Sequence, residues 1–320
     1  MDALQARTWV SWFQDRFSEL DAGLRDGDLA SAWSAHRRGR HYTGPRTVYG
    51  KPIWSSRKPV DRLVVLLGFE PAFNQDVGYG DTFWMARYFP RALALAGAVT
   101  VVTQPRAERL LRHSLPSCHV VSTVDAKARA IGAADAVVDQ FFLPAVMDDR
   151  DVAADPYISA NESAVAAYRA TFTADALHVG VCWGSEGTYQ HAKARSAGAD
   201  SLAPLASLGG VAWHSLMRRP GARAPIAMTE YEPVDFADTA ALIGALDAVV
   251  TTDTAVANLA GAMGKPTFVV VPSEANFRWG RGETTPWYPS ARVIRAAPCE
   301  PWSGPFARAG DALQSLMEAA

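Results

Sequence analysis

The sequence predicts an α/β protein made of two Rossmann-like, doubly wound domains that face a cleft, preceded by a short helical extension. Two series of apolar runs alternate with helical patterns, and a polar connector without strand signals separates the two series. Strands that are apolar on both faces are typical of parallel sheets covered by helices on both sides. With 320 residues, 49% of them hydrophobic and 20% charged, the chain is long enough for two such domains.

Residues 1–55 are expected to form the helical extension. The stretch FSELDAGLRDGDLASAWSAHRRGRHY has apolar residues at helical spacing, interrupted by Asp26-Gly27-Asp28. This pattern predicts a helix, a turn and a second helix.

The first α/β domain is predicted over residues 56–150. Its strands are four apolar runs with few polar residues: LVVLLGF (63–69), AVTVVTQ (98–104), HVVSTV (119–124) and AVVDQFFLP (136–144). Helical patterns such as TFWMARYFPRALALAG and RAERLLRHS lie between them. This alternation predicts parallel strands joined by helices.

Residues 151–176 are expected to form a polar, alanine-rich helical connector, and the alternation restarts in the second domain, residues 177–320. Its predicted strands are HVGVCWG (178–184), VAWHSLM (211–217), IAMTEY (226–231), AVVTT (248–252), TFVVVPS (267–273) and ARVIRA (291–296). The segment FARAGDALQSLMEA predicts a closing helix.

Composition and charge exclude several classes of protein. The net charge of −2 and the pI near 6.4 argue against a dedicated nucleic-acid or membrane surface. No segment has ~18 uninterrupted apolar residues and the N-terminus lacks a signal-type apolar stretch, so we expect no membrane span. The cysteines Cys118, Cys182 and Cys299 have no paired or metal-ligand spacing, so we expect buried free thiols in a reducing compartment, the cytoplasm.

The stretch DAVVTTDTAVANLAGAMGKPTFVVVPS (247–273) predicts an anion site. Thr252, Asp253 and Thr254 end a buried strand, and a helix of small residues follows. The first-turn N–H groups of a helix lack helical partners, and the helix dipole places about half a positive charge there, so a phosphate fits. We expect Asp253 to turn back as a cap or to bind a sugar hydroxyl. The alternative is an ordinary capped strand–helix junction.

The stretch VGVCWGSEGTYQHAKARS (179–196) follows the first strand of the second domain. Gly184 and Ser185 open this loop, and His191, Lys193 and Arg195 close it. A flexible loop with two cations suits a phosphate clamp. The Walker spacing is absent. The alternative is a solvated basic loop.

The stretch FNQDVGYGDTFWMARYFP (73–90) follows the first strand of the first domain. Gly78 and Gly80 permit a close backbone approach to a ligand, and Asp81 is placed at the start of a helix. Asp81 is therefore a candidate general base. The alternative is an N-cap aspartate. The third glycine of the dinucleotide fingerprint is missing.

The stretch SEANFRWGRGETTPWYP (273–289) combines aromatic and guanidinium groups, which suit a nucleotide base, a sugar or a diphosphate. The alternative is a lid that packs on its own aromatic residues. Two Asp-x-Asp matches, at 26–28 and 149–151, do not follow strands, so metal–nucleotide binding is not expected at either. The histidines lack metal-ligand spacing and no Gly-x-Ser-x-Gly elbow is present.

Together these stretches resemble a known family. GYGDTFWMARYFPRALALAG is similar to the Gly-Asp-Thr segment of tetratricopeptide-associated glycosyltransferases related to the heptosyltransferases, of the family 9 type. DFADTAALIGALDAVVTTDTAVANLAGAMGKPTFVVVP is similar to the most diagnostic block of that family, and FRWGRGETTPWYPSARVIR continues the match. The resemblance covers most of residues 60–300. The helical pair before residue 50 resembles a degenerate tetratricopeptide repeat.

The resemblance implies a GT-B fold whose second domain binds a nucleoside-diphosphate sugar and whose first domain binds the acceptor. It implies no metal and no cofactor other than the donor substrate. By matching the family motif, Asp81 is the implied base, and Asp253, Thr254 and Ala255 are the implied donor-binding residues. The basic loop departs from the family pattern: it is shorter, and lysine replaces arginine in the pair Lys193 and Arg195. Asn258 replaces the usual histidine of the family.

The complete expected site follows from these stretches and this resemblance. The catalytic residue is Asp81, and the donor phosphates are bound by Thr252, Asp253, Thr254, Ala255, Lys193, Arg195, Gly184 and Ser185. The vicinity of the nucleotide and sugar comprises Ser215, Leu216, Asn258, Arg278 and Trp279. The acceptor side comprises Gly78, Gly80 and Thr82.

We therefore expect glycosyl transfer from a nucleoside-diphosphate sugar to a hydroxyl-bearing acceptor. The alternatives are a nucleotide-sugar epimerase of the same architecture, and a non-catalytic nucleotide-binding module whose N-terminal helices dock a partner. A dehydrogenase is disfavoured because the dinucleotide glycines are missing. The sugar, the nucleotide base, the oligomeric state and the acceptor stay open, the acceptor among protein, glycan, small molecule and modified nucleic acid.

Overall fold

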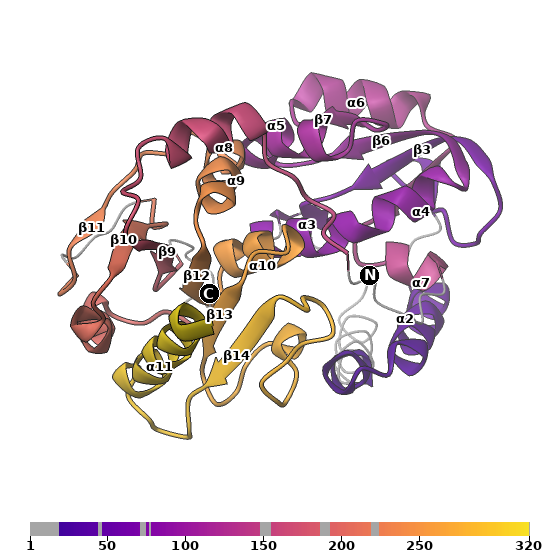
Figure 1. Ribbon diagram of the computed structural model, residues 1–320. Coiled ribbons are helices and arrows are strands. Elements are labelled where there is room, and N and C mark those ends of the chain that lie inside the picture. The colour runs from indigo at the N-terminus through magenta and orange to yellow at the C-terminus, as the bar shows by residue number, and fades with distance from the viewer. Residues whose placement is uncertain are drawn as a thin grey trace. The chain divides into compact units, whose positions relative to one another are not determined.

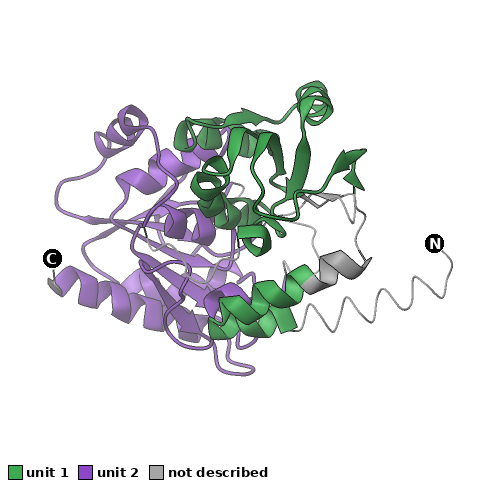
Figure 2. Ribbon diagram, turned by 90° about the vertical axis from the view of Figure 1, so that its right-hand side faces the viewer, with its two compact units in different colours: residues 1–153 green, residues 154–320 purple. Residues whose placement is uncertain are grey.

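The computed structural model describes residues 19–43, 47–70, 75–76, 78–147, 155–185, 193–218 and 224–319. The chain divides into two compact units, residues 1–153 and 154–320, which Figure 2 shows in green and purple. The prediction of an α/β fold with two parallel sheets is confirmed.

The first described part of unit 1 is a helical pair. Residues 19–26 are helical, Gly27 turns the chain in the left-handed region with a φ of 78°, and helix α2 spans Leu29–Thr43. The expected helix–turn–helix around Asp26-Gly27-Asp28 is therefore confirmed. Helix α2 packs against α7 (Leu143–Met147), where Nη1 of Arg37 donates to the carbonyl of Ala145 at 2.6 Å. The resemblance of this helical pair to a tetratricopeptide repeat stays a prediction.

The sheet of unit 1 has four parallel strands in the order β7–β6–β3–β8 (Figure 1). The strands are β3 (Val60–Leu66), β6 (Ala96–Val102), β7 (His119–Val121) and β8 (Ala136–Asp139). The helices are α3 (Tyr79–Met85), the 3-10 helix η1 (Ala86–Tyr88), α4 (Phe89–Leu93), α5 (Pro105–Ser114), α6 (Val124–Ala133) and α7. Two short antiparallel pairs join β1 (Thr47–Val48) to β2 (Lys51–Pro52) and β4 (Phe69–Glu70) to β5 (Gln75–Asp76).

The observed elements of unit 1 differ from the predicted ones at two places. The strand expected over 63–69 begins at Val60 and ends at Leu66, because Gly68 turns the chain with a φ of 92°. The single helix expected after residue 81 is divided into α3, η1 and α4. Pro90 lies at this division, and proline is accepted in the first turn of a helix but not in its interior.

The sheet of unit 2 has six parallel strands in the order β11–β10–β9–β12–β13–β14. The strands are β9 (Leu177–Cys182), β10 (Val211–Ser215), β11 (Met228–Thr229), β12 (Ala248–Thr252), β13 (Thr267–Val271) and β14 (Ala291–Arg295). The helices are α8 (Glu162–Arg169), η2 (Ala199–Ser207), α9 (Phe236–Ala245), α10 (Ala255–Ala262), η3 (Phe277–Trp279) and α11 (Ser303–Ala319). Every strand expected here forms at its predicted place.

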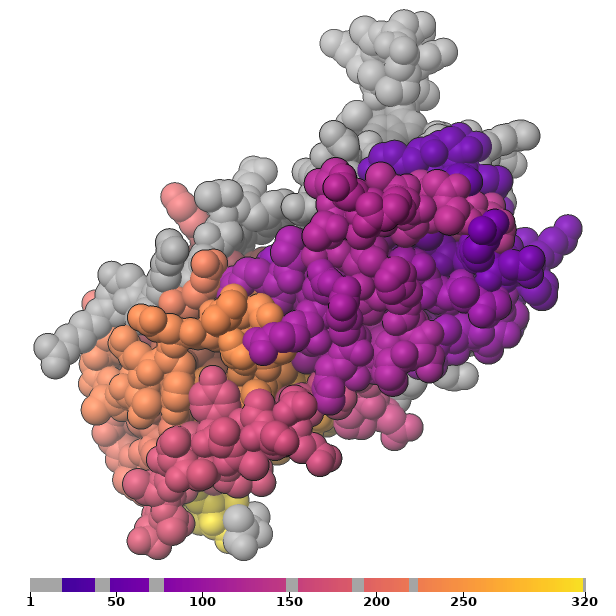
Figure 3. Space-filling view, turned by 90° about the horizontal axis from the view of Figure 1, so that it is seen from above, coloured from indigo at the N-terminus to yellow at the C-terminus, as the bar shows by residue number. Residues whose placement is uncertain are grey.

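Helices cover both faces of this second sheet. Helices η2 and α11 pack on one face, where Leu202, Leu205, Phe306 and Leu313 join the strand residues Val181 and Val250 in one buried core. Helix α10 packs on β12 and β13 and contacts α9. Helix α8 lies against α9, and the rose surface borders the orange surface in Figure 3. Because the strands are buried on both faces, their sequences read as unbroken apolar runs.

Strand order identifies a switch point in each sheet. Counted along the chain, the order in unit 2 is 3-2-1-4-5-6, so connections leave in opposite directions from β9 and β12. In unit 1 the order is 3-2-1-4, and the corresponding pair is β3 and β8. Open α/β sheets bind ligands beyond the carboxyl ends of the strands at such a point. The topology therefore predicts a ligand site beyond the carboxyl ends of β9 and β12, and another beyond those of β3 and β8.

Cysteine exposure differs from expectation. All three thiols are free, as predicted, but only Cys182 is buried, whereas Cys118 is partly exposed and Cys299 is exposed. The expectation of three buried thiols is wrong for these two because Cys118 lies in the bend before β7 and Cys299 lies in a turn after β14. No helix within the described ranges is long and apolar enough to cross a bilayer.

A chain of hydrogen bonds joins the end of α8 to the sheet of unit 2. The Nε2 of His178 lies 2.8 Å from the carbonyl of Thr173, its Nδ1 lies 2.8 Å from Nε2 of His214, and Nδ1 of His214 lies 2.8 Å from the Tyr231 hydroxyl. A carbonyl only accepts, so in neutral rings each group donates in one direction, from Tyr231 through both histidines to Thr173. The ring of Phe172 stacks on His178 at 4.2 Å.

This geometry gives unit 2 an acid-sensitive connection. The pKa of His214 is lowered from 6.5 to about 4, mainly because the ring is buried and secondly because His178 lies nearby. A lowered pKa means that the unfolded chain takes up the proton first as the pH falls. We predict that stability declines on acidification from about pH 6.5 towards pH 4, measured by urea unfolding at a series of pH values. His214→Gln, which cannot titrate, is expected to show a shallower decline, and an unchanged slope would contradict this account.

Candidate functional site

The switch point of unit 2 carries the candidate site. Strand β9 ends at Cys182 and β12 ends at Thr252, and these neighbouring strands run parallel with Thr251 paired to Cys182. Gly184 and Ser185 follow the first strand, and Asp253 and Thr254 follow the second. The two loops predicted to bind phosphate therefore meet at one edge of one sheet.

Thr254 occupies the N-cap position of α10 but does not cap it. Its φ of −129° and ψ of 177° are those of an N-cap, yet its side chain makes no capping hydrogen bond. Its hydroxyl instead lies 3.1 Å from the hydroxyl of Thr251 and 3.7 Å from Sγ of Cys182. Several other helices within the described residues do have a side-chain cap, among them those preceded by Thr123, Asn161 and Asp235.

The partial positive charge at the N-terminus of α10 is therefore not offset by a side-chain cap. A side-chain cap normally accepts a hydrogen bond from the first-turn N–H groups, and Thr254 leaves those groups to another acceptor. The buried hydroxyl of Thr252, the last residue of β12, has no hydrogen-bond partner. Small residues from Ala255 to Ala262 keep the helix slim. An anionic oxygen satisfies such a helix terminus.

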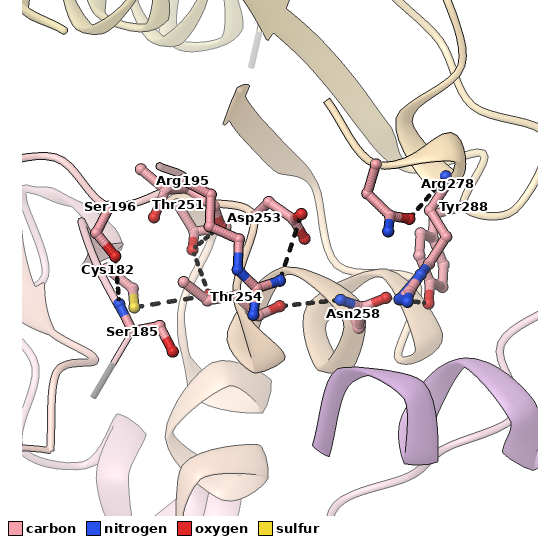
Figure 4. Close-up of polar contacts among 12 residues, drawn as sticks. Cys182, Ser185, Arg195, Ser196, Thr251, Asp253, Thr254, Asn258, Arg278 and Tyr288 are labelled. Carbon is pink, nitrogen blue, oxygen red and sulfur yellow. Dashed lines mark hydrogen bonds and ion pairs between the residues drawn. The ribbon is translucent and has the colours of Figure 1, made fainter. Parts of the chain in front are cut away.

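Arg195 brings a guanidinium group to this point. Its Nη1 lies 3.4 Å from Oδ2 of Asp253, and its side chain crosses the start of α10 in Figure 4. The Asp253 side chain is 5% exposed and that of Arg195 is 32% exposed. The expectation that Asp253 turns back as a helix cap is wrong, because its carboxylate pairs with the guanidinium instead. This pairing neutralises the carboxylate that would otherwise repel a phosphate.

The loop that carries Arg195 is closed at its base. The N–H of Ser185 donates to Oγ of Ser196 at 3.0 Å, and the N–H of Ala197 donates to the carbonyl of Trp183 at 2.7 Å. An added Cβ at Gly184 would lie 3.3 Å from Cβ of Ser196, so glycine allows this approach. Lys193 is exposed and makes no ion pair with any residue of the described ranges, and its contact with a phosphate stays a prediction. His191 lies outside the described residues.

Asn258 and Tyr288 tie α10 to the aromatic segment after β13. The Asn258 amide donates from Nδ2 to the carbonyl of Thr254 at 2.9 Å, and its Oδ1 accepts the Tyr288 hydroxyl at 2.9 Å (Figure 4). Both side chains are buried. Gly261 lies on the same helix, where an added Cβ would be 2.5 Å from Cγ of Tyr288. Asn258 therefore fixes the helix whose N-terminus forms the site.

The other residues expected near the nucleotide lie inside the protein. Ser215 is buried and its hydroxyl accepts from the N–H of Met217 at 3.3 Å, while Leu216 packs against Gly180. Trp279 has no exposed surface, and the buried Arg278 guanidinium lies 5.3 Å from the centre of the Phe277 ring. These residues form walls of the second unit in this structure, and their contact with a nucleotide stays a prediction.

The residues expected on the acceptor side lie in unit 1. Asp81 is partly exposed in the first turn of α3, and the N-cap is Gly78, so the alternative that Asp81 is the N-cap is wrong. Gly78 is exposed and Gly80 is partly exposed. The Thr82 side chain is fully buried and its hydroxyl donates to Oε1 of Gln104 at 2.9 Å.

Four contributors lie in the stretches singled out from the sequence but were not among the expected site residues: Cys182, Thr251, Ser196 and Tyr288. Each acts by holding a neighbour: Thr251 and Cys182 turn the Thr254 hydroxyl away from its helix, and the other two hold Ser185 and Asn258. The pairing of β9 with β12 would have indicated the first two, since it places the ends of both strands together. Within the described residues, no three His, Cys, Asp or Glu side chains gather as a metal site.

Solved structures with the same fold are glycosyltransferases. The glycosyl transferase family 9 protein from Veillonella parvula has a TM-score of 0.60 and 11% identity, covering 81% of this chain and 98% of that one. ADP-heptose lps heptosyltransferase II from E. coli has a TM-score of 0.56 and 14% identity, covering 81% and 100%. The iron-containing dodecameric glycosyltransferase TibC from enterotoxigenic E. coli has a TM-score of 0.52 and 14% identity, covering 76% and 65%. The chain therefore has the α/β fold of GT-B glycosyltransferases.

Among curated proteins, Protein FlbA from Caulobacter vibrioides is 37% identical over 82 residues. This match spans 26% of the chain and 14% of FlbA. No protein-family model matches the chain.

The close approach of α10 to Tyr288 gives a stability prediction. Gly261→Ala places a methyl group against the Tyr288 ring, so we expect a loss of about 1–3 kcal/mol from overpacking. Gly132→Ala in α6 is the matched control, because its new methyl meets no atom within 4 Å and alanine favours a helix by up to about 1 kcal/mol. Chemical denaturation measures both variants. Equal effects of the two substitutions would contradict the close approach of α10 to Tyr288.

Proposed function

We propose that the protein is a glycosyltransferase that moves a sugar from a nucleoside-diphosphate sugar to a hydroxyl-bearing acceptor. The observation that carries this proposal is the uncapped N-terminus of α10, with Arg195 across it, at the switch point of unit 2. The GT-B fold shared with solved glycosyltransferases supports it.

The donor diphosphate binds at the N-terminus of α10. The N–H groups at the start of α10 donate to phosphate oxygens, and Arg195 supplies the positive charge that stabilises the departing diphosphate. Preorganised donors of this kind are often worth a few kcal/mol each in a transition state. One of the solved structures is an ADP-heptose heptosyltransferase by name, which supports a nucleoside diphosphate as the leaving group. Since protein groups supply this charge, we propose that the reaction needs no metal.

The acceptor binds to unit 1, where Asp81 is the base. Asp81 takes the proton of the acceptor hydroxyl as that oxygen forms a bond to the anomeric carbon. The bond between the anomeric carbon and the phosphate oxygen breaks, and its electron pair leaves with the nucleoside diphosphate. The partly exposed carboxylate in the first turn of α3 supports this role.

Arg195 and Lys193 provide a matched pair of cations for testing the donor site. A hydrogen bond to a charged group contributes about 1.5–3 kcal/mol, so Arg195→Ala is expected to weaken nucleoside-diphosphate binding about 10-fold or more. Lys193→Ala tests the second expected cation of the loop, and a smaller loss of affinity is expected because Lys193 is exposed and pairs with no carboxylate of the described ranges. Calorimetric titration across the five common nucleoside diphosphates measures both. Equal Kd values for wild type and Arg195→Ala would contradict the proposed clamp.

Asp81→Asn tests the catalytic role. A positioned base typically contributes ~10²–10⁴-fold, so kcat for transfer is expected to fall by about that factor while donor affinity stays unchanged. The assay follows nucleoside-diphosphate release with and without acceptor. Turnover of the donor sugar to its epimer without acceptor would favour the epimerase, and binding without any turnover would favour the nucleotide-binding module. Wild-type kcat in Asp81→Asn would exclude Asp81 as the base.

A further inference from the structure

The switch point of unit 1 is filled by the protein itself. Gln104 follows β6, Gln140 follows β8, and Gly68 follows the strand between them, β3. The N–H of Gly68 donates to Oε1 of Gln140 at 2.7 Å, which spans the switch point. Gln104 and Gln140 are both buried, at 7% and 0% exposure.

Gln104 contacts both ends of the segment that carries Asp81. At one end its amide packs on Gly68, where an added Cβ would lie 2.4 Å from Oε1 and where φ is 92°. At the other end its Oε1 accepts the hydroxyl of Thr82, the residue after Asp81, at 2.9 Å. The long connection between β3 and α3 is thus fixed at Gly68 and at Thr82.

Thr82 is the first buried residue of α3, whereas Asp81 beside it is partly exposed. The helix has seven residues, and its N-cap residue, Gly78, has no side chain that could cap it. A short helix without a cap holds its first turn weakly, since helix termini depend on such bonds. The buried hydrogen bond from Thr82 to Gln104 therefore anchors the first turn, and Asp81 with it, to the loop after β6, in addition to the packing of the buried residues that follow in α3.

We propose that Gln104 and Thr82 are positioning residues for Asp81. This inference rests on the proposed function, in which Asp81 is the base. A general base must lie within hydrogen-bond reach of its proton, and a displacement of about 1 Å can cost ~10²-fold in rate. Gln104 occupies the N-cap position of α5 but directs its amide to Thr82 rather than to its own helix.

Three substitutions separate positioning from general stability. Thr82→Val is nearly isosteric and removes the hydroxyl, Thr82→Ser keeps the hydroxyl, and Thr103→Val removes a buried hydroxyl that has no hydrogen-bond partner next to Gln104. We expect Thr82→Val to lower kcat ~10-fold or more with donor KM unchanged, since the donor site is in the other unit. Thr82→Ser is expected to restore most of kcat, and Thr103→Val to keep it. Wild-type kcat in Thr82→Val, or an equal loss in Thr82→Ser or Thr103→Val, would overturn the inference.

Hydrogen exchange gives a second readout that needs no turnover. In Thr82→Val the amides of residues 79–85 are expected to exchange faster than in wild type, and in Thr103→Val they are expected to be unchanged. Unchanged exchange in Thr82→Val would overturn the inference whether or not transfer is detected. A different result would contradict only the role of Asp81 in the proposed function: wild-type kcat in Asp81→Asn together with faster exchange of the α3 amides in Thr82→Val.

Discussion

The hydrogen bond between the hydroxyls of Thr251 and Thr254 is the interaction on which the candidate site depends. Together with the Cys182 thiol, it turns the N-cap side chain of α10 towards the sheet and away from its own helix. A threonine that capped the helix would satisfy the positive terminus from within. Because the hydroxyl is used elsewhere, the terminus keeps its capacity for an external anion, and Arg195 adds a charge at the same place.

The two switch points of this chain are used differently. In unit 2 the residues after β9 and β12 are hydroxyls, glycine and one ion pair, and they surround a helix terminus that attracts anions. In unit 1 the residues after β3 and β8 are joined to each other by Gly68 and Gln140, and Gln104 adds a second amide. The same topology therefore leaves a helix terminus without a side-chain cap in unit 2, whereas in unit 1 side-chain amides bond to the end of β3 and to the segment that carries Asp81. This division agrees with the proposal that the donor binds to unit 2 and the acceptor to unit 1.

Much of the fold could be predicted from the sequence because parallel strands read as apolar runs. The sequence located every strand of both main sheets, and it placed Thr254 and Asp81 at the starts of helices. The directions of side chains could not be predicted, because they depend on neighbours that are distant in sequence. Asp253 pairs with Arg195, 58 positions earlier, and Asn258 binds Tyr288 in a different loop. The histidine chain of unit 2 was missed for the same reason, since His178 and His214 lie on separate strands.

The most direct test of the central claim is an amide NMR titration of unlabelled nucleoside diphosphate into the ¹⁵N-labelled protein. The account predicts that the largest shifts fall on the N–H groups of Ala255, Val256 and Ala257 and on Nε of Arg195. Binding that leaves these groups unshifted, with the largest shifts elsewhere in the chain, would contradict it.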